Sequence, residues 1–276
     1  MSKMLMFKNI RFYAYCLSGS FIHHQYLKNT KNMIQIKNLH VTAKTKKILQ
    51  WVSFDFSLGK NYCLLGRNGS GKSTLSSVLM GSPKYQIESG TMTLDGADLA
   101  KMSPEHRAQA GLFLSFQNVP EISGIKLSEY LRTIYNISLK NKDSEAKDIS
   151  PFIFKRFIQK HIVELDIDPV LLERELNVGF SGGEKRKIEI LQMKLIAPSY
   201  IILDEIDSGL DLDAFRKVCE FLQSINSDKN TLIIITHYFK ILEYIDVDEV
   251  IVLEAGNIKK QGWSELIEQI KKDGFE

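Results

Sequence analysis

Alternating apolar and polar residues predict β-strands in the first part of the chain. The alternation covers residues 34–41 and resumes over residues 49–58, with aliphatic or aromatic side chains at the apolar positions. Because successive side chains of a strand point to opposite faces, this pattern is typical of strands with one buried face. We expect these stretches to form antiparallel strands that flank a short apolar strand beginning at Tyr62. Residues 91–94 predict a further short strand that ends in a turn.

A helical spacing of apolar residues replaces this alternation in the middle of the chain. Between about residues 126 and 178 the apolar positions recur every three or four residues, and a polar loop is expected at residues 141–150. We interpret this region as a helical subdomain inserted into a sheet-based domain that spans residues 33–276.

Short apolar runs elsewhere in the chain predict buried strands. Such runs occupy residues 112–116, 200–203, 231–235 and 247–253, while residues 263–272 have the spacing of an amphipathic helix. In the second half of the chain these runs alternate with helical segments. This order favours an α/β fold with a mostly parallel sheet covered by helices.

A glycine-rich stretch between a predicted strand and a predicted helix has the spacing of a P-loop. Glycines allow successive backbone N–H groups to converge on one phosphate, and the helix N-terminus favours the same anion. Lys72 is expected to reach the β- and γ-phosphates of a nucleotide, and the Ser73 hydroxyl to coordinate Mg²⁺. The candidate nucleotide-binding residues here are Gly66, Arg67, Asn68, Gly69, Ser70, Gly71, Lys72, Ser73 and Thr74.

Four further polar residues follow predicted strands, where open α/β sheets bind their ligands. Asp204 is expected to hold Mg²⁺, and Glu205 to orient or deprotonate the attacking water. Gln117 is placed to bridge the metal and the water, which makes it both a catalytic and a metal candidate. His237 is expected to hydrogen-bond the γ-phosphate.

The composition is that of an ordinary soluble globular protein of 276 residues. Three widely separated cysteines, Cys16, Cys63 and Cys219, match no metal-binding spacing and indicate reduced thiols in a reducing compartment. No stretch approaches the roughly 18 apolar residues of a membrane span, so we expect no crossing of a bilayer by this chain itself.

The N-terminal extension, residues 1–32, carries five cations and no acidic residue. Without these five charges the formal net charge changes from +3 to −2, so nothing in the remaining chain favours nucleic acid as a partner. The composition permits an organelle transit peptide. A disordered extension or a misassigned start is the alternative, because Met33 immediately precedes the first predicted strand.

The motifs together resemble those of ABC-type ATPases. The P-loop, Gln117, the sequence Ser-Gly-Gly-Glu at residues 181–184, the pair Asp204-Glu205, the turn at residues 208–211 and His237 occur in that family's order. The resemblance implies a P-loop NTPase with a RecA-like parallel core sheet, an antiparallel β subdomain and the inserted helical subdomain. It also implies an ATP-dependent head-to-tail homodimer, in which one subunit's Ser-Gly-Gly caps the ATP on the other's P-loop. The further nucleotide-binding candidates are therefore Ser181, Gly182, Gly183, Glu184 and Asp211.

Within this superfamily the chain is most similar to the SufC family. The similarity is carried by separated segments at residues 81–85, 113–117, 119–124, 180–186, 189–193, 202–213 and 235–238. It implies a cytoplasmic ATPase, or an organellar one if residues 1–32 are a transit peptide, that acts on SufB- and SufD-like scaffold proteins in iron–sulfur cluster assembly. Residues 115–132 would face the scaffold, and the ATPase itself would hold no cluster. A nucleotide-binding subunit of an ABC transporter is the alternative.

One departure from the superfamily concerns the nucleotide base. Many ABC-type ATPases stack an aromatic side chain on adenine, but residues 40–47 contain no Phe, Tyr or Trp. We expect adenine to rest on His40 or Val41 and base discrimination to be weak.

Overall fold

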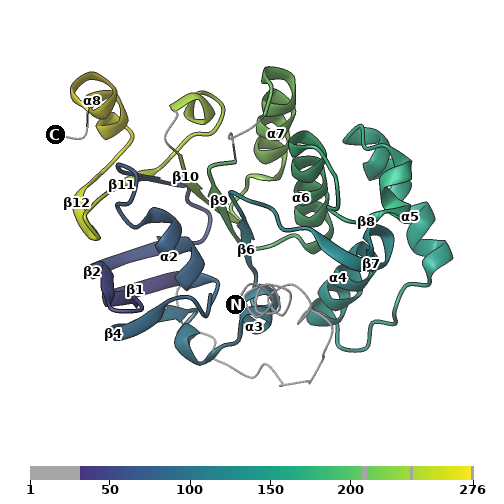
Figure 1. Cartoon of the computed structure of the whole chain (residues 1–276), viewed down its shortest axis with the longest axis horizontal. Helices are drawn as coiled ribbons and strands as arrows, with labels where there is room; N and C mark the ends of the chain where they lie inside the picture. Colours follow the sequence, from purple (N-terminus) through teal and green to yellow (C-terminus); the bar gives the residue numbers. More distant parts are fainter. Residues whose placement is uncertain (1–31, 207–209, 237–238, 275–276) are drawn as a thin grey trace. The chain divides into compact units, whose positions relative to one another are not determined.

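The computed structural model describes residues 32–206, 210–236 and 239–274 (Figure 1). The chain divides into two compact units. The described part of the sheet unit comprises residues 32–116, 198–206, 222–236 and 239–274, and that of the helical unit comprises residues 117–197 and 210–221. The N-terminal extension, apart from Asn32, lies outside the described residues, so the interpretations given for it remain predictions.

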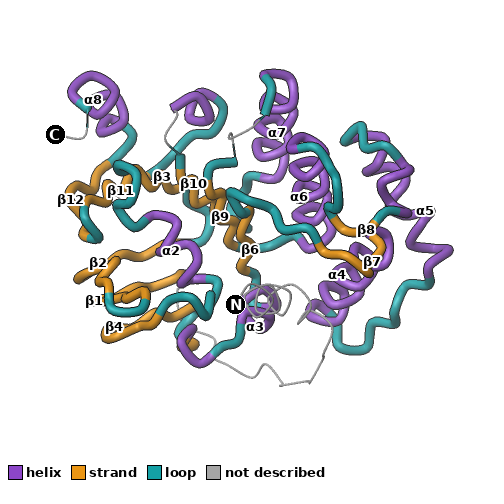
Figure 2. The backbone as a smooth tube through the Cα atoms, viewed as in Figure 1, coloured by secondary structure: helices purple, strands orange, loops and turns teal. Residues whose placement is uncertain are grey.

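The sheet unit contains a six-stranded sheet in the order β12-β11-β3-β10-β9-β6 (Figure 2). Every neighbouring pair except β11–β12 is parallel, as the alternation of strands and helices predicted. The strands are β3 (Tyr62–Leu65), β6 (Leu112–Ser115), β9 (Tyr200–Asp204), β10 (Thr231–Ile235), β11 (Glu249–Glu254) and β12 (Asn257–Gly262). The central strands β3, β9 and β10 are buried along their whole length, which explains their uninterrupted apolar sequences.

A second, antiparallel sheet of the same unit has the order β2-β1-β4-β5. Its strands are β1 (Met33–Ala43), β2 (Lys46–Ser57), β4 (Gln86–Leu94) and β5 (Ala97–Asp98). The expectation that β1 and β2 flank the P-loop strand is wrong, because the neighbours of β3 are β10 and β11. Alternating strands bury one face only, whereas β3 is buried on both faces and pairs with strands of its own kind.

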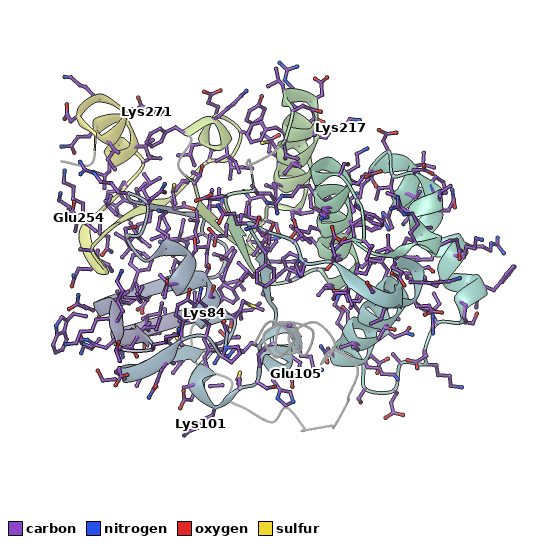
Figure 3. The ribbon with its side chains drawn as sticks, viewed as in Figure 1. Lys84, Lys101, Glu105, Lys217, Glu254 and Lys271 are labelled. Carbon is purple, nitrogen blue, oxygen red and sulfur yellow. The ribbon has the colours of Figure 1, made fainter. Side chains whose placement is uncertain are left out.

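Short helices complete the sheet unit: α2 (Lys72–Leu79), η2 (Leu99–Lys101), α3 (Pro104–Gln109), η4 (Phe239–Glu243) and α8 (Glu265–Asp273). A buried guanidinium group joins two of them to the end of α2. Arg107 donates hydrogen bonds to the carbonyls of Val78 at 2.6 Å and Leu79 at 2.8 Å, and to the carbonyl of Leu99 at 2.5 Å. Nearby Lys101 differs, since 85% of its side chain is exposed (Figure 3). Arg107 therefore satisfies carbonyls at the helix end that would otherwise be buried without partners.

The helical unit contains α4 (Leu127–Lys142), α5 (Pro151–Glu164), η3 (Pro169–Glu173), α6 (Gly182–Ile196) and the first part of α7 (Leu212–Ile225). Strand β7 (Ile122–Lys126) precedes α4, strand β8 (Glu175–Leu176) follows η3, and the two pair as an antiparallel ribbon. The apolar positions with helical spacing, including Leu131 and Ile158, form its core together with residues of α6 such as Leu191. Among the described residues, no helix combines the length and the apolar character that a membrane crossing needs.

Candidate nucleotide-binding site

The P-loop connects β3 to α2 within the sheet unit, as its spacing predicted. Three of its glycines, Gly66, Gly69 and Gly71, have φ angles of 148°, 76° and 112°, which side-chain-bearing residues rarely adopt. A Cβ atom at Gly66 would lie 2.2 Å from the carbonyl oxygen of Leu253 and 2.7 Å from the Ser70 hydroxyl oxygen. Only glycine fits at position 66, so the loop is built around a close approach of two backbone segments.

The N-terminus of α2 is open to an anion. Its N-cap residue, Gly71, provides no side-chain hydrogen bond, and the first turn contains no acidic residue. The neighbouring hydroxyl of Ser70 is buried and has no hydrogen-bond partner in the structure. Unsatisfied donors at a helix N-terminus suit a phosphate group, because its oxygens accept several hydrogen bonds. The loop therefore fits a phosphate-bearing ligand.

Lys72 lies across the loop. Its Nζ atom donates to the carbonyl oxygens of Gly66 at 2.8 Å and Arg67 at 3.2 Å. Burial lowers the pKa of Lys72, and the carboxylates of Glu205 and Asp204 oppose this effect. A buried ammonium group that relies on backbone carbonyls is suited to exchange these partners for the charged oxygens of a phosphate.

Asp204 lies at the carboxyl end of β9 and is 5% exposed. Its two carboxylate oxygens accept hydrogen bonds from the hydroxyls of Ser73 and Ser76, each at 3.1 Å. Burial raises the pKa of Asp204, and the two hydroxyl groups partly offset this rise. Hydroxyl and carboxylate oxygens are ligands that Mg²⁺ favours, so this donor set fits the expected metal. Sequence reasoning missed Ser76, although its spacing of three residues from Ser73 places both on one face of α2.

Glu205 has a left-handed backbone conformation, with φ of 52°. Its backbone N–H donates to the carbonyl oxygen of Ile235, at 2.9 Å, and so joins the carboxyl ends of β9 and β10. A non-glycine residue with positive φ is uncommon and occurs disproportionately at functional sites. His237 follows Ile235 by two positions and lies outside the described residues, so its expected role stays a prediction.

The residues Ser181, Gly182, Gly183 and Glu184 form the start of α6 in the helical unit. The Ser181 hydroxyl accepts from the backbone N–H of Glu184 at 3.3 Å, and the Glu184 carboxylate accepts from the N–H of Ser181 at 2.7 Å. This reciprocal capping box fixes the Ser181 side chain at the helix N-terminus. The hydrogen bonds from Ser181 lower the pKa of Glu184. Glu184 is therefore occupied by the cap, a role that was missed although the Ser-x-x-Glu spacing of residues 181–184 is a signature of it.

Two other candidates of the helical unit have local structural roles. Asp211 caps α7, because its carboxylate accepts from the backbone N–H of Ala214 at 2.8 Å. Gln117 begins the unit directly after β6, and its carbonyl oxygen lies 3.5 Å from a guanidinium nitrogen of Arg186. Arg186 also forms a buried ion pair with Glu189 at 2.5 Å. The contacts of Gln117 and Asp211 with nucleotide remain predictions.

The expected adenine surface needs a correction. Val41 is 1% exposed and belongs to the buried core, so it provides no surface for a base. His40 is half-buried and forms an edge-to-face contact with Trp51, with ring centroids 4.1 Å apart. Trp51 is 69% exposed and belongs to β2, outside the stretch in which an aromatic residue was sought.

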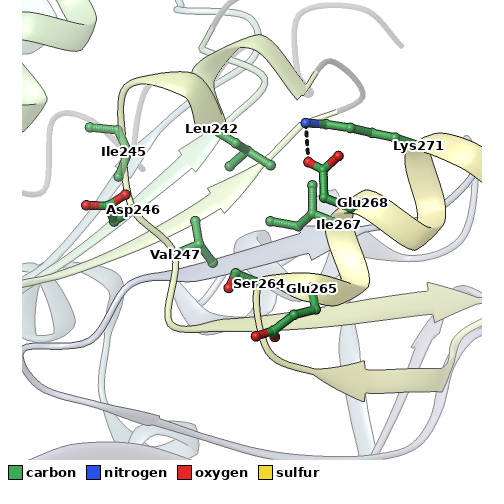
Figure 4. A pocket seen from close by; sticks show the side chains of 9 residues that line it. All are labelled: Leu242, Ile245, Asp246, Val247, Ser264, Glu265, Ile267, Glu268 and Lys271. Carbon is green, nitrogen blue, oxygen red and sulfur yellow. Dashed lines mark hydrogen bonds and ion pairs between the residues drawn. The ribbon is translucent and has the colours of Figure 1, made fainter.

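A separate pocket of about 400 Å³ lies beside α8 in the sheet unit (Figure 4). Apolar side chains such as Leu242, Val247 and Ile267 line it, together with acidic residues including Glu265 and Glu268. Carboxylates repel phosphate, so this pocket is a poor candidate for the nucleotide. Across the part of the chain that the structure describes, no group of three or more His, Cys, Asp or Glu side chains is arranged to hold a metal ion.

Comparison with known proteins agrees with the P-loop geometry. A family model described as "ABC transporter" matches residues 49–208. "Probable ATP-dependent transporter SufC" of Escherichia coli is 42% identical over 243 residues, which cover 88% of this chain and 97% of the relative. "Iron-sulfur cluster assembly protein SufC" of Plasmodium berghei is 36% identical over 245 residues, covering 88% of this chain and 67% of the relative.

Solved structures show the same fold at lower sequence similarity. An "ATP binding subunit of ABC transporter" has a TM-score of 0.70 and 22% identity, covering 88% of this chain and 95% of that one. An ATP-binding cassette, described as a dimer in a post-hydrolysis state with ADP and Pi, has a TM-score of 0.69 and 17% identity. That match covers 83% of this chain and 98% of the other. The expected fold class is confirmed.

Proposed function

The chain belongs to the ABC transporter family and within it resembles the SufC proteins, and we propose that it couples ATP hydrolysis to iron–sulfur cluster assembly. ATP binding and hydrolysis would drive a conformational change in a scaffold of SufB- and SufD-like proteins. The protein is an ATPase. The proposal adds the identity of its partner, the scaffold. We place this activity in the cytoplasm, in keeping with reduced cysteines.

One arrangement carries the nucleotide part of the proposal. Lys72 and Ser73 lie at the end of the P-loop, where α2 begins, and the Ser73 hydroxyl contacts the carboxylate of Asp204 at the end of a parallel strand. These residues bring an ammonium group, a hydroxyl and a carboxylate to one edge of the sheet. The similarity to SufC proteins over most of the chain supports the choice of iron–sulfur cluster assembly over other tasks of the family.

Each candidate residue has a defined role in this proposal. Backbone N–H groups of the P-loop and the Lys72 ammonium would bind the phosphates, while Ser73, Asp204 and Gln117 would hold Mg²⁺, which would supply positive charge to the phosphate oxygens. Glu205 orients the attacking water and accepts its proton, and His237 donates a hydrogen bond to the γ-phosphate.

The second half of the site would come from another copy of the chain. Ser181, Gly182 and Gly183 present a hydroxyl and backbone N–H groups at the N-terminus of α6, which suits a phosphate. In a head-to-tail dimer these groups would close over ATP bound to the partner's P-loop. Hydrolysis removes the bridging γ-phosphate, so the dimer would reopen and transmit the motion to the scaffold.

A transporter subunit is the second candidate. Several similar proteins are named probable ATP-dependent transporters, and both tasks use the same ATPase fold. The two proposals differ in their partner, which is soluble in the first and spans the membrane in the second.

A pull-down from native cells tests the proposed function. We would use the full chain with Glu205→Gln, plus ATP and Mg²⁺, so that the closed dimer accumulates; Lys72→Met is the control that cannot hold ATP. Enrichment of soluble SufB- or SufD-like proteins on the Glu205→Gln chain is the expected result. Enrichment of a multi-span membrane protein instead would overturn the proposal in favour of the transporter.

A further inference from the structure

Two segments of the helical unit meet around Ser181. The Lys185 ammonium donates to the Glu121 carboxylate at 2.9 Å, and the Asn177 side-chain amide donates to the carbonyl of Pro120 at 3.1 Å. Asn177 and Lys185 lie four residues before and four residues after Ser181. The segment that follows β6 therefore holds the chain on both sides of this serine.

Lys185 is directly linked to Ser181 through the backbone. Its N–H donates to the Ser181 carbonyl at 3.0 Å, which begins the regular hydrogen bonding of α6. The Ser181 hydroxyl is fixed in turn by the N–H of Glu184. A shift of Lys185 relative to Glu121 therefore moves the serine hydroxyl together with the first turn of the helix.

The Glu121–Lys185 ion pair is partly exposed to solvent. The Lys185 side chain is 20% exposed, and the Glu121 side chain is 49% exposed. Lys185 lowers the pKa of Glu121, with a smaller contribution from the backbone of Gly179. Partly exposed ion pairs contribute little to overall stability. The main effect of the contact is therefore expected on the position of Ser181.

We propose that Glu121, acting through Lys185, is a positioning residue for Ser181 in the ATP-bound dimer. The inference rests on the proposed function, in which Ser181 closes over the nucleotide of a second copy.

The test measures ATP- and Mg²⁺-dependent dimerisation by analytical ultracentrifugation. The full chain with Glu205→Gln is the parent, and Glu121→Gln, Lys185→Met and both changes together are added to it. We expect each single change to weaken dimerisation about tenfold, and the double change to weaken it no further, because both remove one contact. Lys187→Met is the matched control, since Lys187 lies on the same helix and pairs with Asp166 at 3.0 Å. It should dimerise like the parent.

Two further readouts separate positioning from a structural role. The affinity of the monomer for a fluorescent ATP analogue should stay within about twofold, since the P-loop is unchanged, and exchanging the charges with Glu121→Lys plus Lys185→Glu should restore dimerisation. Parental dimerisation in all three variants would overturn the inference alone. The inference would also be overturned if the variants bound the ATP analogue as monomers about tenfold more weakly and melted at a lower temperature, because the loss of dimerisation would then reflect a general structural defect. If the parent itself does not dimerise with ATP, the proposed closed dimer is wrong and the inference falls with it.

Discussion

The Ser73 hydroxyl on α2 lies 3.1 Å from the carboxylate of Asp204 at the end of β9. The two residues are 131 positions apart, and Ser76 donates to the other oxygen of the same carboxylate. Burial raises the pKa of Asp204, so the ionised carboxylate is held at a free-energy cost. The hydroxyl groups of Ser73 and Ser76 and the ammonium group of Lys72 partly offset this cost. A buried anion that is costly without a cation is what a metal site requires.

Asp204→Asn is expected to stabilise the nucleotide-free chain and to abolish its response to Mg²⁺. The raised pKa means that the folded state binds the Asp204 proton more tightly than the unfolded state does. The free energy of unfolding that Asp204 contributes therefore falls as the pH rises through the folded-state pKa. Asparagine keeps one oxygen as the acceptor for one serine hydroxyl, its NH2 group can donate to the other, and the charge is removed. We expect a gain of about 1 kcal/mol, or roughly 2–4 °C in Tm, at pH 8.

Differential scanning calorimetry in EDTA at pH 5 and pH 8 checks this expectation. The gain of Asp204→Asn over the parent should be larger at pH 8, and Mg²⁺ with ATP should raise the Tm of the parent alone. Ser76→Ala is the control, because it removes one donor and leaves the charge. An asparagine variant that is less stable than the parent at both pH values would contradict the argument.

Two glycines of the P-loop should differ sharply in their tolerance of alanine. A Cβ at Gly66 would lie 2.2 Å from a backbone oxygen, whereas a Cβ at Gly69 meets nothing within 4 Å. Gly69→Ala carries only the strain of a positive φ, about 1 kcal/mol. Gly66→Ala must displace backbone and should cost several kcal/mol, or prevent folding. Urea unfolding of both variants measures the difference, and equal midpoints would show that the close approach of Leu253 is relieved at no cost.

Arg107→Lys is expected to destabilise the sheet unit although the charge is kept. The guanidinium donates to several carbonyls in a fixed planar arrangement, which a single ammonium group cannot reproduce. Buried carbonyls left without a donor should lower the free energy of unfolding by about 2–3 kcal/mol. Chemical denaturation measures this loss. Lys101→Met, at an exposed side chain, should stay within about 0.5 kcal/mol, and similar losses for both would contradict the role of Arg107.

Local spacing was sufficient to predict the P-loop, because its glycines, Lys72 and Ser73 form one continuous turn. The strand preceding Asp204 was likewise evident from its apolar run. The contact between Ser76 and Asp204 was not predictable, since it depends on how α2 packs against β9. The same limit explains the wrong expectation for Val41. The alternation of residues 34–41 predicted a strand with one buried face, but it did not show that burial leaves Val41 with no surface for a base. Strand β12 was missed because its sequence is mostly polar and its pairing with β11 is set by the turn at Gly256.

The last prediction concerns the nucleotide base: the chain should discriminate weakly between ATP and GTP. Discrimination by large factors requires a site built to hydrogen-bond one base and to leave polar groups unpaired with the other. Residues 40–47 contain no Phe, Tyr or Trp, and Val41 is buried in the core. Binding would then depend on the triphosphate, which ATP and GTP share. Competition against a fluorescent ATP analogue should give Kd values for the two nucleotides within about fivefold.

Trp51→Ala, at the exposed aromatic residue next to His40, is the informative variant. If ATP binds more than about fiftyfold tighter than GTP and Trp51→Ala removes that preference, Trp51 is the base-recognition residue and the prediction of weak discrimination is wrong.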